Sequence, residues 1–362
     1  MRIFFFIQGE GRGHQTQAIA LHDILVRAGH EVTGAIVGTA PGRGVPAMLS
    51  RHFRFPLTAL SSPALQYSHR GKGLAVWRTF SRNARYIPAF WKQGEEADRI
   101  IAGHRPDLII NFYEMLCGIW QWRCRRPIPV LSVAHQYLLE HKAFSIRHST
   151  GYFHRVALDN VSRLSAVGTT LRLALSFYEF PDDGTIRVVP PLLRPDLRSL
   201  QVRDDGFLLA YMTHYKLGSD LEDWCSRHPD VPVEAFWDHP EHREPYRPLP
   251  NLVFHPVDPI AFLDAMRRCK GLVSTSGFES ISEAMYLGKP VMLFPTPRHF
   301  EQEINARDAV QAGAGIRAES FRDLDLFLDY LPRYESVQAR FRAWYDQGEA
   351  RWLKLIAEVT RR

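Results

Sequence analysis

The chain has 362 residues, of which 45% are hydrophobic, and this length can support more than one packed domain. Its four cysteines form no Cys-x-x-Cys pair, which disfavours a disulfide scaffold or a zinc site and suits a reducing cytosol. The net charge of +6 is compatible with an anionic partner but does not choose one.

The N-terminal stretch MRIFFFIQGEG has one basic residue and a very short apolar run, so it predicts a first buried strand and not a signal peptide. No apolar run in the sequence approaches the roughly 18 residues that a membrane span needs. We therefore expect a cytoplasmic protein, with peripheral contact at the inner face of a membrane left open.

The first half of the chain alternates between strand and helix patterns. A continuous apolar run at 2–7 predicts a strand buried on both faces. Helical spacing of apolar residues follows it and ends at Gly29. Further strands are predicted at 31–38, 107–112, 128–133, 164–168 and 185–189. This alternation favours a parallel, doubly wound sheet.

A proline-rich stretch at 191–205 interrupts the alternation and predicts a linker. Strands and helices then resume, beginning with a strand at 207–212. We expect an α/β protein with two Rossmann-like doubly wound domains facing a cleft, at 1–190 and 206–335. A C-terminal helix at 336–362 is expected to pack back on the first domain. Ligands of such sheets bind at the carboxyl ends of the strands.

A basic stretch runs from residue 51 to 92, with eight Lys or Arg and no Asp or Glu. Arg78, Arg82 and Arg85 share one helical face beside aromatic residues, and Pro88 is predicted to split the segment into two helices. Such a face suits an anionic membrane or an acidic soluble acceptor. It is equally compatible with a solvated surface. Nucleic acid is not an expected partner, because no recognised nucleic-acid-binding fold accompanies the charge.

The stretch from Ser274 to Ala306, STSGFESISEAMYLGKPVMLFPTPRHFEQEINA, holds the most informative order of elements. A strand ends near Thr275, Gly277 permits a tight turn, and a helix starts near Phe278. Helix starts have free N–H groups and a partial positive charge, which can hold a diphosphate. The simpler interpretation is a helix capped by serine with nothing bound.

Later parts of the same stretch carry acids and an amide. Glu283 lies within the helix and can accept hydrogen bonds from both hydroxyls of a ribose if it faces a cleft. Glu301 and Gln302 lie where a loop enters the next helix, and an acid beside an amide suits a sugar ring. The alternative for Glu301 is favourable interaction with the helix dipole. Asn305 is a candidate structural hydrogen-bonding residue.

This ordered stretch resembles the nucleotide-sugar signature of GT-B glycosyltransferases. It is closest to the branch of the cell-wall lipid-intermediate N-acetylglucosaminyltransferase, which is family 28-like. The resemblance covers about 33 residues. It implies that Ser276, Gly277 and Phe278 approach the donor diphosphate, that Glu283 binds the ribose, and that Glu301 and Gln302 bind the sugar. It also implies a nucleobase near His255 and Val257.

The loop GEGRGH at 9–14 follows the first strand, but it lacks a third glycine and no acid ends the second strand, so an NAD site is disfavoured. The resemblance implies a loop that meets acceptor and donor phosphates, including Gly13. His14 would lie at the helix start, where it could be the general base. It could equally cap the helix or bind phosphate.

Other polar residues follow predicted strands, where residues that contact ligands are common. Glu114 and His135 in the first domain could each be the base or orient His14, with helix capping as the alternative for Glu114. In the second domain, Thr213 and His214 follow the first strand and could reach the diphosphate.

We therefore expect a glycosyltransferase that moves a sugar from a nucleotide-sugar donor, with a UDP-sugar as the expected co-substrate, to an acceptor hydroxyl. The acceptor is unknown and could be linked to a lipid. No cofactor and no metal ligands are predicted, on the expectation that the chain holds no Asp-x-Asp metal motif anywhere, and the resemblance implies inversion. The alternatives are a UDP-sugar 2-epimerase of the same fold, a non-catalytic protein that binds sugar nucleotides, and a basic protein that binds lipid or nucleic acid.

Overall fold

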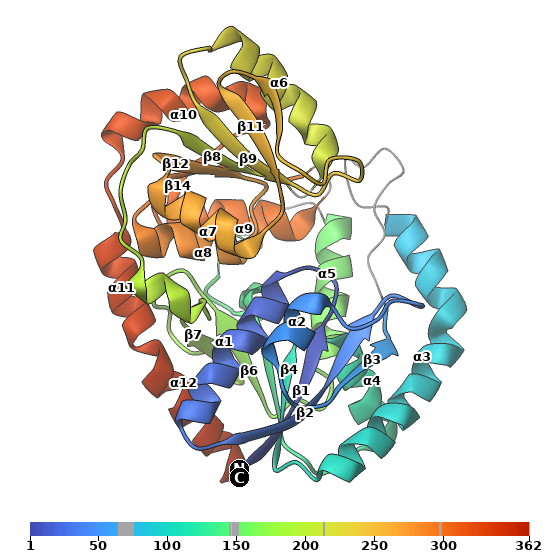
Figure 1. Ribbon diagram of the computed structural model, residues 1–362. Helices are drawn as coiled ribbons and strands as arrows, with labels where there is room; N and C mark the ends of the chain where they lie inside the picture. Colours follow the sequence, from blue (N-terminus) through green and yellow to red (C-terminus); the bar gives the residue numbers. More distant parts are fainter. Residues whose placement is uncertain (64–75, 145, 147–151, 213, 297–298, 362) are drawn as a thin grey trace. The chain divides into compact units, whose positions relative to one another are not determined.

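The computed structural model describes residues 1–63, 76–144, 146, 152–212, 214–296 and 299–361, and it leaves out the side chains of 76–84, 87, 152–155 and 157. The described chain divides into two compact units, each built on its own sheet (Figure 1). The first unit holds the described residues up to Arg194 together with the stretch from Trp344 onward. The second runs from Pro195 to Ala343.

The sheet of the first unit has seven described strands in the order β3-β2-β1-β4-β5-β6-β7, and all neighbours pair in parallel. The order reverses between β1 and β4, which are neighbours in the sheet. The strands are β1 (Arg2–Gln8), β2 (Glu31–Thr39), β3 (Leu57–Ser61), β4 (Leu108–Phe112), β5 (Val130–Ala134), β6 (Leu171–Leu175) and β7 (Ile186–Val189).

Helices cover both faces of this sheet. Successive buried side chains of β1 point to opposite faces and are apolar, so both faces have to be covered. Phe4 and Phe6 are buried in one core with Trp120 of α4. Phe5 faces the other way and packs on Phe53. The helices of the unit are α1 (Gly13–Arg27), α2 (Ala47–His52), α3 (Val76–His104), α4 (Met115–Cys124), α5 (Tyr152–Ser165), α12 (Gly348–Thr360) and the 3₁₀ helix η1 (His135–Glu140).

The sheet of the second unit also has seven described strands, in the order β10-β11-β9-β8-β12-β13-β14. The strand β10 pairs antiparallel with β11, and the other neighbours are parallel. Here the order reverses between β8 and β12. The strands are β8 (Leu208–Tyr211), β9 (Val233–Trp237), β10 (Tyr246–Leu249), β11 (Leu252–Pro256), β12 (Gly271–Ser274), β13 (Val291–Leu293) and β14 (Gly315–Arg317).

The helices of the second unit begin at local sequence signals. At the start of α7, the Asp258 side chain accepts hydrogen bonds from the N–H groups of Ile260 and Ala261, and Pro259 occupies the first turn. The helices are α6 (Gly218–Arg227), α7 (Pro259–Arg268), α8 (Phe278–Leu287), α9 (Phe300–Gln311) and α10 (Leu324–Tyr330), with 3₁₀ helices η3 (Pro195–Ser199), η4 (Tyr215–Leu217), η5 (Phe321–Asp323) and η6 (Leu331–Arg333).

The division between the units falls inside α11 (Gln338–Asp346), so the C-terminal helix α12 belongs to the first unit. The indole Nε1 of Trp344 donates to the carbonyl of Ser176 at 3.0 Å. From α12, Arg351 donates to the carbonyl of Val188 on β7 and pairs with Asp182 at 2.7 Å. The chain end is thus held by hydrogen bonds to the last strand of the first sheet.

The predicted α/β class with two doubly wound sheets is confirmed, but several details of the sequence interpretation are wrong. The strands β3 and β10 were missed, since both are short and weakly patterned. Residues 164–168 are not a strand. They form the end of α5 and a turn at Gly168, which has φ of 68°, and the true strand β6 follows. Leu164 packs against the core that α3 and α4 share, and Val167 lies beside Gly118 of α4, so their apolar character reflects helix packing.

The predicted break at Pro88 is also wrong, because α3 runs continuously from Val76 to His104 with Pro88 inside it. Proline removes one N–H donor and strains a helix, but tertiary packing can outweigh this local cost. Phe90, Ala97 and Ile101 are buried in the core that α3 shares with α4. Before the proline, the half-buried Tyr86 packs against the same core, so α3 is held on both sides of Pro88.

No helix in the described part of the chain is both long enough and apolar enough to cross a membrane.

The helix α4 offers a test of this packing at Gly118. A methyl group added there would lie 1.7 Å from the carbonyl oxygen of Leu164 on α5, so one helix has to move. We expect Gly118→Ala to lower the free energy of unfolding by about 1–3 kcal/mol. Urea unfolding followed by circular dichroism measures the midpoint.

Gly103 on α3 is the matched control, since nothing lies within 4 Å of a methyl group there. Gly103→Ala should leave the midpoint unchanged or raise it, by up to about 1 kcal/mol, because alanine favours the helix. An unchanged midpoint for Gly118→Ala would show that α4 and α5 do not pack as described.

Candidate functional site

The predicted diphosphate loop lies where the strand order of the second sheet reverses. The strand β12 ends at Ser274, and α8 begins at Phe278 with Gly277 as its N-cap residue. Gly277 has no side chain, and no side-chain hydrogen bond caps this helix end. Ligands of doubly wound sheets bind at such reversal points, where adjacent loops diverge. The simpler interpretation, a helix capped by serine, is wrong, because the N-cap residue is Gly277.

The turn itself differs from the expectation that glycine provides it. Ser276 has the left-handed conformation, with φ of 65°, whereas Gly277 is extended with φ of −72°. The Nδ2 group of Asn305 on α9 donates to the carbonyl of Ser276 at 3.0 Å. Asn305 is 1% exposed, so this bond is made inside the protein. It holds the strained serine from a point 29 residues away, which confirms a structural role for Asn305.

Three successive hydroxyl-bearing residues, Ser274, Thr275 and Ser276, are fully buried in this turn. Their side-chain oxygens have no hydrogen-bond partner among the described residues. Ser280 and Ser282, further along α8, instead donate to helix carbonyls. Buried polar atoms normally have partners, so an unpaired group of this kind needs an explanation. The turn therefore offers hydroxyl groups beside a helix start whose N-cap residue makes no side-chain cap.

The two acids of α8 differ in burial. Glu283 is 3% exposed, whereas Glu279 in the first turn is half-buried. Glu283 lies five residues beyond the helix start, on the same helix as the hydroxyl-bearing turn. The buried position makes Glu283 a candidate for binding a polar ligand inside the protein.

The loop between β13 and α9 is organised by Gln302, which is buried in the first turn of α9. Its Oε1 atom accepts a hydrogen bond from the backbone N–H of Thr296 at 2.8 Å, so the carboxamide oxygen is used within the loop. The N–H of Gln302 donates to Nδ1 of His299 at 3.4 Å. Burial lowers the pKa of His299 to about 4, and a backbone hydrogen bond opposes the shift. Glu301 is half-buried beside them.

The remaining predicted residues of the second unit lie at other strand ends. Thr213 is outside the described residues. His214 follows β8, the neighbour of β12, and its Nδ1 accepts from the N–H of Lys216 at 3.2 Å. His255 ends β11, two strands further from the reversal point, and stacks on Phe236 at 5.0 Å. Val257 follows it and is half-buried.

In the first unit, the glycine-rich loop follows β1 and leads into α1, which begins at Gly13. The Nε2 group of Gln15 donates to the carbonyls of Gly9 and Gly11 at 3.0 and 2.9 Å. Glu10 accepts from the N–H of Ala40, just beyond β2, at 3.2 Å. Side-chain to backbone bonds therefore fix the loop, and the sequence interpretation had overlooked Gln15.

His14 lies at the point where this sheet reverses its order, between β1 and β4. Its ring stacks on Tyr113, the residue after β4, with the ring centres 5.4 Å apart. Tyr113 has φ of 57° and its hydroxyl bonds Ser162 at 2.8 Å. Sequence analysis missed Tyr113, because its left-handed conformation, which is typical of a site when a bulky aromatic adopts it, is visible only in the structure.

The protonation state of His14 follows from its burial. Burial lowers its pKa to about 4, and the hydrogen bond with Gln17 opposes the shift. The ring is therefore neutral at pH 7. Its Nδ1 lies 3.2 Å from Oε1 of Gln17, and a carboxamide oxygen can only accept. The proton consequently sits on Nδ1, and the lone pair of Nε2 is available to accept one.

Glu114 has a structural role, whichever other function it serves. It is the N-cap residue of α4, and its Oε1 accepts from the N–H of Leu116 at 2.9 Å and from the hydroxyl of Ser62. The carboxyl group lies beside Gly38, in space that a Cβ atom would fill. Burial raises the pKa of Glu114 to about 7, and the two hydrogen bonds oppose this shift.

His135 follows β5, the strand next to β4, so His14, Glu114 and His135 come from the ends of three adjacent strands. Its Nδ1 lies 2.7 Å from the carbonyl of Leu175, which fixes the proton on Nδ1. Burial lowers the pKa of His135 to about 4. At neutral pH both histidines are thus uncharged, and Glu114 titrates.

The expectation that the chain holds no Asp-x-Asp motif is wrong, because one occurs at Asp323 and Asp325, outside the predicted donor motif. Asp323 forms a capping box with Ser320, and Asp325 lies 3.0 Å from His228. Both acids are therefore engaged in local structure. Within the described part of the chain, potential metal ligands converge at His22, Asp23 and His52, none of which belongs to the predicted site.

A sequence profile described as Glycosyl transferase family 1 matches residues 1–332, which is most of the chain. The chain belongs to this family. The predicted glycosyltransferase class is thereby confirmed. No curated protein sequence matches the chain.

Solved structures of other glycosyltransferases share the fold along the whole length of this one. The kitacinnamycin glycosyltransferase matches with a TM-score of 0.64 at 16% identity, over 99% of this chain and 98% of its own. MurG from Acinetobacter baumannii matches with a TM-score of 0.60 at 16% identity, over 99% of both chains. VinC, in complex with dTDP, matches with a TM-score of 0.60 at 16% identity, over the full length of both chains. These matches confirm the GT-B fold.

The glycosyltransferase allows a pH test at Glu114. Because folding raises the pKa of this acid from 4.5 to about 7, the folded state binds a proton that the unfolded state has lost. Its contribution to the free energy of unfolding is complete below pH 4.5 and is lost progressively as the pH rises from 4.5 through about 7. We expect the stability of the wild type to fall by about 1.4 kcal/mol per pH unit in this window, relative to Glu114→Gln.

Glutamine keeps an oxygen that can accept from Leu116 and Ser62, so the two proteins differ mainly in the titrating proton. Urea midpoints measured at half-unit steps from pH 5 to pH 8 give the difference. A difference that stays constant with pH would mean that Glu114 has an ordinary pKa.

Proposed function

We propose that this glycosyltransferase binds a pyrimidine nucleoside diphosphate sugar in its second unit and transfers the sugar to an acceptor hydroxyl, with inversion and without a metal ion. The observation that carries the proposal is the β12–α8 turn. It combines three buried hydroxyls that lack partners among the described residues with the uncapped start of α8. A diphosphate is an acceptor-only group, so it matches a set of donors of this kind.

The donor would be held along the second unit by groups of different chemistry. The hydroxyls of Ser274, Thr275 and Ser276 and the N–H groups at Phe278 would donate to the diphosphate. Glu283 would accept from the ribose. Glu301 would accept from sugar hydroxyls, while Gln302 keeps its oxygen on Thr296 and would offer its amide N–H groups.

The solved structures of similar glycosyltransferases give information about the nucleobase of the donor. The structures of VinC and of the rhamnosyltransferase SpnG were determined with thymidine diphosphate. A uridine donor has two ribose hydroxyls for Glu283, and a thymidine donor has one. The comparison of UDP with dTDP therefore tests both the base and the role of Glu283, and we retain the UDP-sugar as the expected donor.

His14 is the proposed general base. In the transfer step, the acceptor oxygen gives its proton to Nε2 of His14 as it forms a bond to the anomeric carbon. The bond from that carbon to the diphosphate oxygen breaks, and the diphosphate leaves with the electron pair. Charge on the leaving group is offset by the N–H groups at the start of α8, so no metal ion is required. Glu114 and His135 are alternatives for the base, since they follow neighbouring strands.

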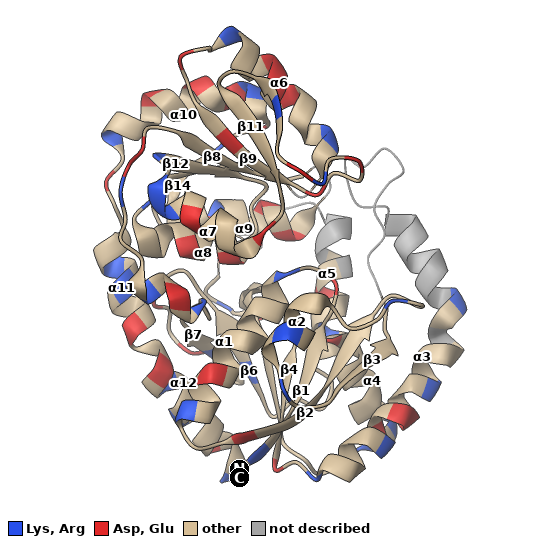
Figure 2. Ribbon diagram, viewed as in Figure 1, with Lys and Arg blue, Asp and Glu red and all other residues tan. Residues whose placement is uncertain are grey.

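The acceptor is proposed to bind the first unit and to carry negative charge, as a lipid-linked diphosphate does. The basic stretch 51–92 supports this, although Arg78 and Arg82 lie outside the side chains that are described. Beyond Lys92, the acids of α3 outnumber its bases, with Glu95, Glu96 and Asp98 against Arg99 (Figure 2). Glu95 and Asp98 pair with Arg123 and Arg126. The excess of positive charge therefore lies before Glu95.

Donor binding tests the β12–α8 turn. We expect Ser276→Gly to weaken the binding of UDP or dTDP by about 10-fold to 100-fold, because one hydrogen bond to a charged group is lost. The same change should raise the urea midpoint, since glycine adopts a φ of 65° without strain. Isothermal titration calorimetry of both diphosphates measures the affinities.

Ser282→Ala is the matched control, because this buried hydroxyl on α8 bonds the carbonyl of Phe278 and is not assigned to the donor. Its diphosphate affinity should equal that of the wild type. A Ser276→Gly variant that binds both diphosphates as well as Ser282→Ala does would place the diphosphate elsewhere.

Product analysis separates the transferase from the epimerase. A panel of UDP-sugars and dTDP-sugars is incubated with the protein, with and without hydroxyl-bearing acceptors, and the sugars are identified by mass spectrometry and NMR. We expect nucleoside diphosphate release that increases with an acceptor, and a decrease of about 10²-fold to 10⁴-fold in His14→Gln with unchanged donor affinity. An epimerised sugar in the absence of acceptor would refute transfer, and full activity of His14→Gln would reassign the base.

A further inference from the structure

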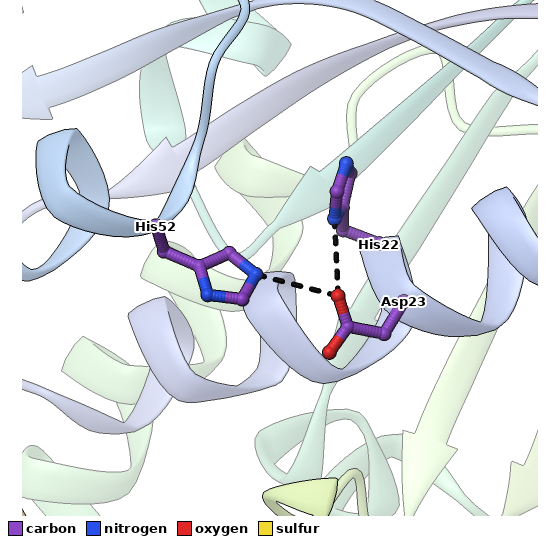
Figure 3. A group of neighbouring side chains, drawn as sticks. All are labelled: His22, Asp23 and His52. Atoms are coloured by element: carbon purple, nitrogen blue, oxygen red, sulfur yellow. Dashed lines mark hydrogen bonds and ion pairs between the residues drawn. The ribbon is translucent and has the colours of Figure 1, made fainter.

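A group of three possible metal ligands lies in the first unit, away from the groups proposed for glycosyl transfer. His22 and Asp23 are neighbours on α1, and His52 is the last residue of α2. Figure 3 shows the two imidazole rings approaching the same oxygen of Asp23 from different directions. One ligand atom from each side chain lies within 4.8 Å of the other two.

The distances from Asp23 to the two histidines match the edges of a metal coordination shell. The Oδ1 atom of Asp23 lies 3.2 Å from Nδ1 of His22 and 3.3 Å from Nε2 of His52. Zinc binds nitrogen and oxygen at about 2.0–2.2 Å, which gives a separation of about 3.3 Å between ligands in a tetrahedron. Without an ion, each imidazole N–H can donate to Asp23. With small movements of the three side chains, one cation could take the place of the two N–H protons between the imidazoles and Asp23.

The side chains are held in place by rings around them. His22 contacts Phe53 edge-to-face at 5.1 Å and Phe55 at 5.6 Å, and these two rings stack on each other at 4.6 Å. His52 contacts Phe53 at 5.2 Å. Neighbouring residues on a helix point in directions about 100° apart, so His22 and Asp23 meet only because His22 turns its nearer nitrogen, Nδ1, toward the acid.

We propose that His22, Asp23 and His52 bind one divalent transition-metal ion of the zinc class. Two imidazole nitrogens and one carboxylate oxygen suit zinc, cobalt or nickel, whereas magnesium and calcium prefer oxygen ligands only. The three side chains are 20%, 27% and 34% exposed, so water can occupy a fourth position. The absence of a Cys-x-x-Cys pair disfavours only a zinc site with thiolate ligands. It does not bear on a site with imidazole ligands.

The ion would join α2 to α1 and so fix the segment between β2 and β3. The first part of this segment holds the glycine-rich loop, since Ala40 donates to Glu10 and Arg43 lies 3.4 Å from the same acid. His22 lies eight residues after His14, about 12 Å along the helix axis. The ion is therefore a brace for the loop, and the transfer step does not use it.

Metal titration of the whole protein tests the proposal. Protein without an affinity tag is stripped with EDTA and titrated with zinc chloride by calorimetry, and with cobalt chloride by visible absorption. We expect one ion per chain, d–d bands from cobalt, and a higher melting temperature with zinc. Asp23→Asn and His52→Ala should each weaken zinc binding at least 10-fold.

Asp23→Asn retains an oxygen that accepts from both imidazoles, so it removes charge while keeping the hydrogen bonds. His30→Ala, a half-buried histidine just beyond α1, is the matched control and should bind zinc like the wild type. If Asp23→Asn does not fold, His52→Ala decides alone. The proposal is overturned if the wild type binds no zinc, or if His30→Ala weakens binding as much as the ligand variants do.

Discussion

The hydrogen bond from Asn305 to the carbonyl of Ser276 is the contact on which the proposed donor site depends. A serine in the left-handed conformation costs about 1–2 kcal/mol, and a buried hydrogen bond returns a similar amount. The bond therefore allows a non-glycine residue to make the turn between β12 and α8. Without it, nothing in the described part of the chain would offset the cost of the left-handed serine.

This contact also explains why the parts of the 274–306 motif occur together. The turn, the helix with Glu283, the strand β13 and the start of α9 are consecutive in the chain, and β12 and β13 are neighbours in the sheet. Asn305 joins the last part of the motif, α9, to its first part, the turn at Ser276. Gln302 performs a similar task one turn earlier in α9, where it holds the loop after β13 through Thr296.

Burial, more than ion pairing, controls the chemistry of the first unit. His14 and His135 are held neutral at pH 7 because burial lowers the pKa of each to about 4, while burial raises the pKa of Glu114 to about 7. Hydrogen bonds to Gln17 and Leu175 then fix the tautomers. Neutral imidazoles with a defined lone pair can accept a proton without first losing one.

The sequence by itself determined the alternation of strands and helices, the two doubly wound sheets and the order of elements in the 274–306 motif. These follow from apolar periodicity and from turn residues, which act over a few neighbouring positions. The prediction that Asn305 makes a structural bond also held, whereas the polar roles assigned to individual site residues stay predictions.

Only the tertiary structure decided which residue makes the turn, and it was Ser276 in place of Gly277. It also decided that Tyr113 lies against His14, that α3 continues through Pro88, and that His52 meets His22 and Asp23. Each of these depends on contacts between residues far apart in the chain. Local propensity and spacing do not report such contacts, because burial and long-range hydrogen bonds can outweigh preferences of about 1–3 kcal/mol at a single position.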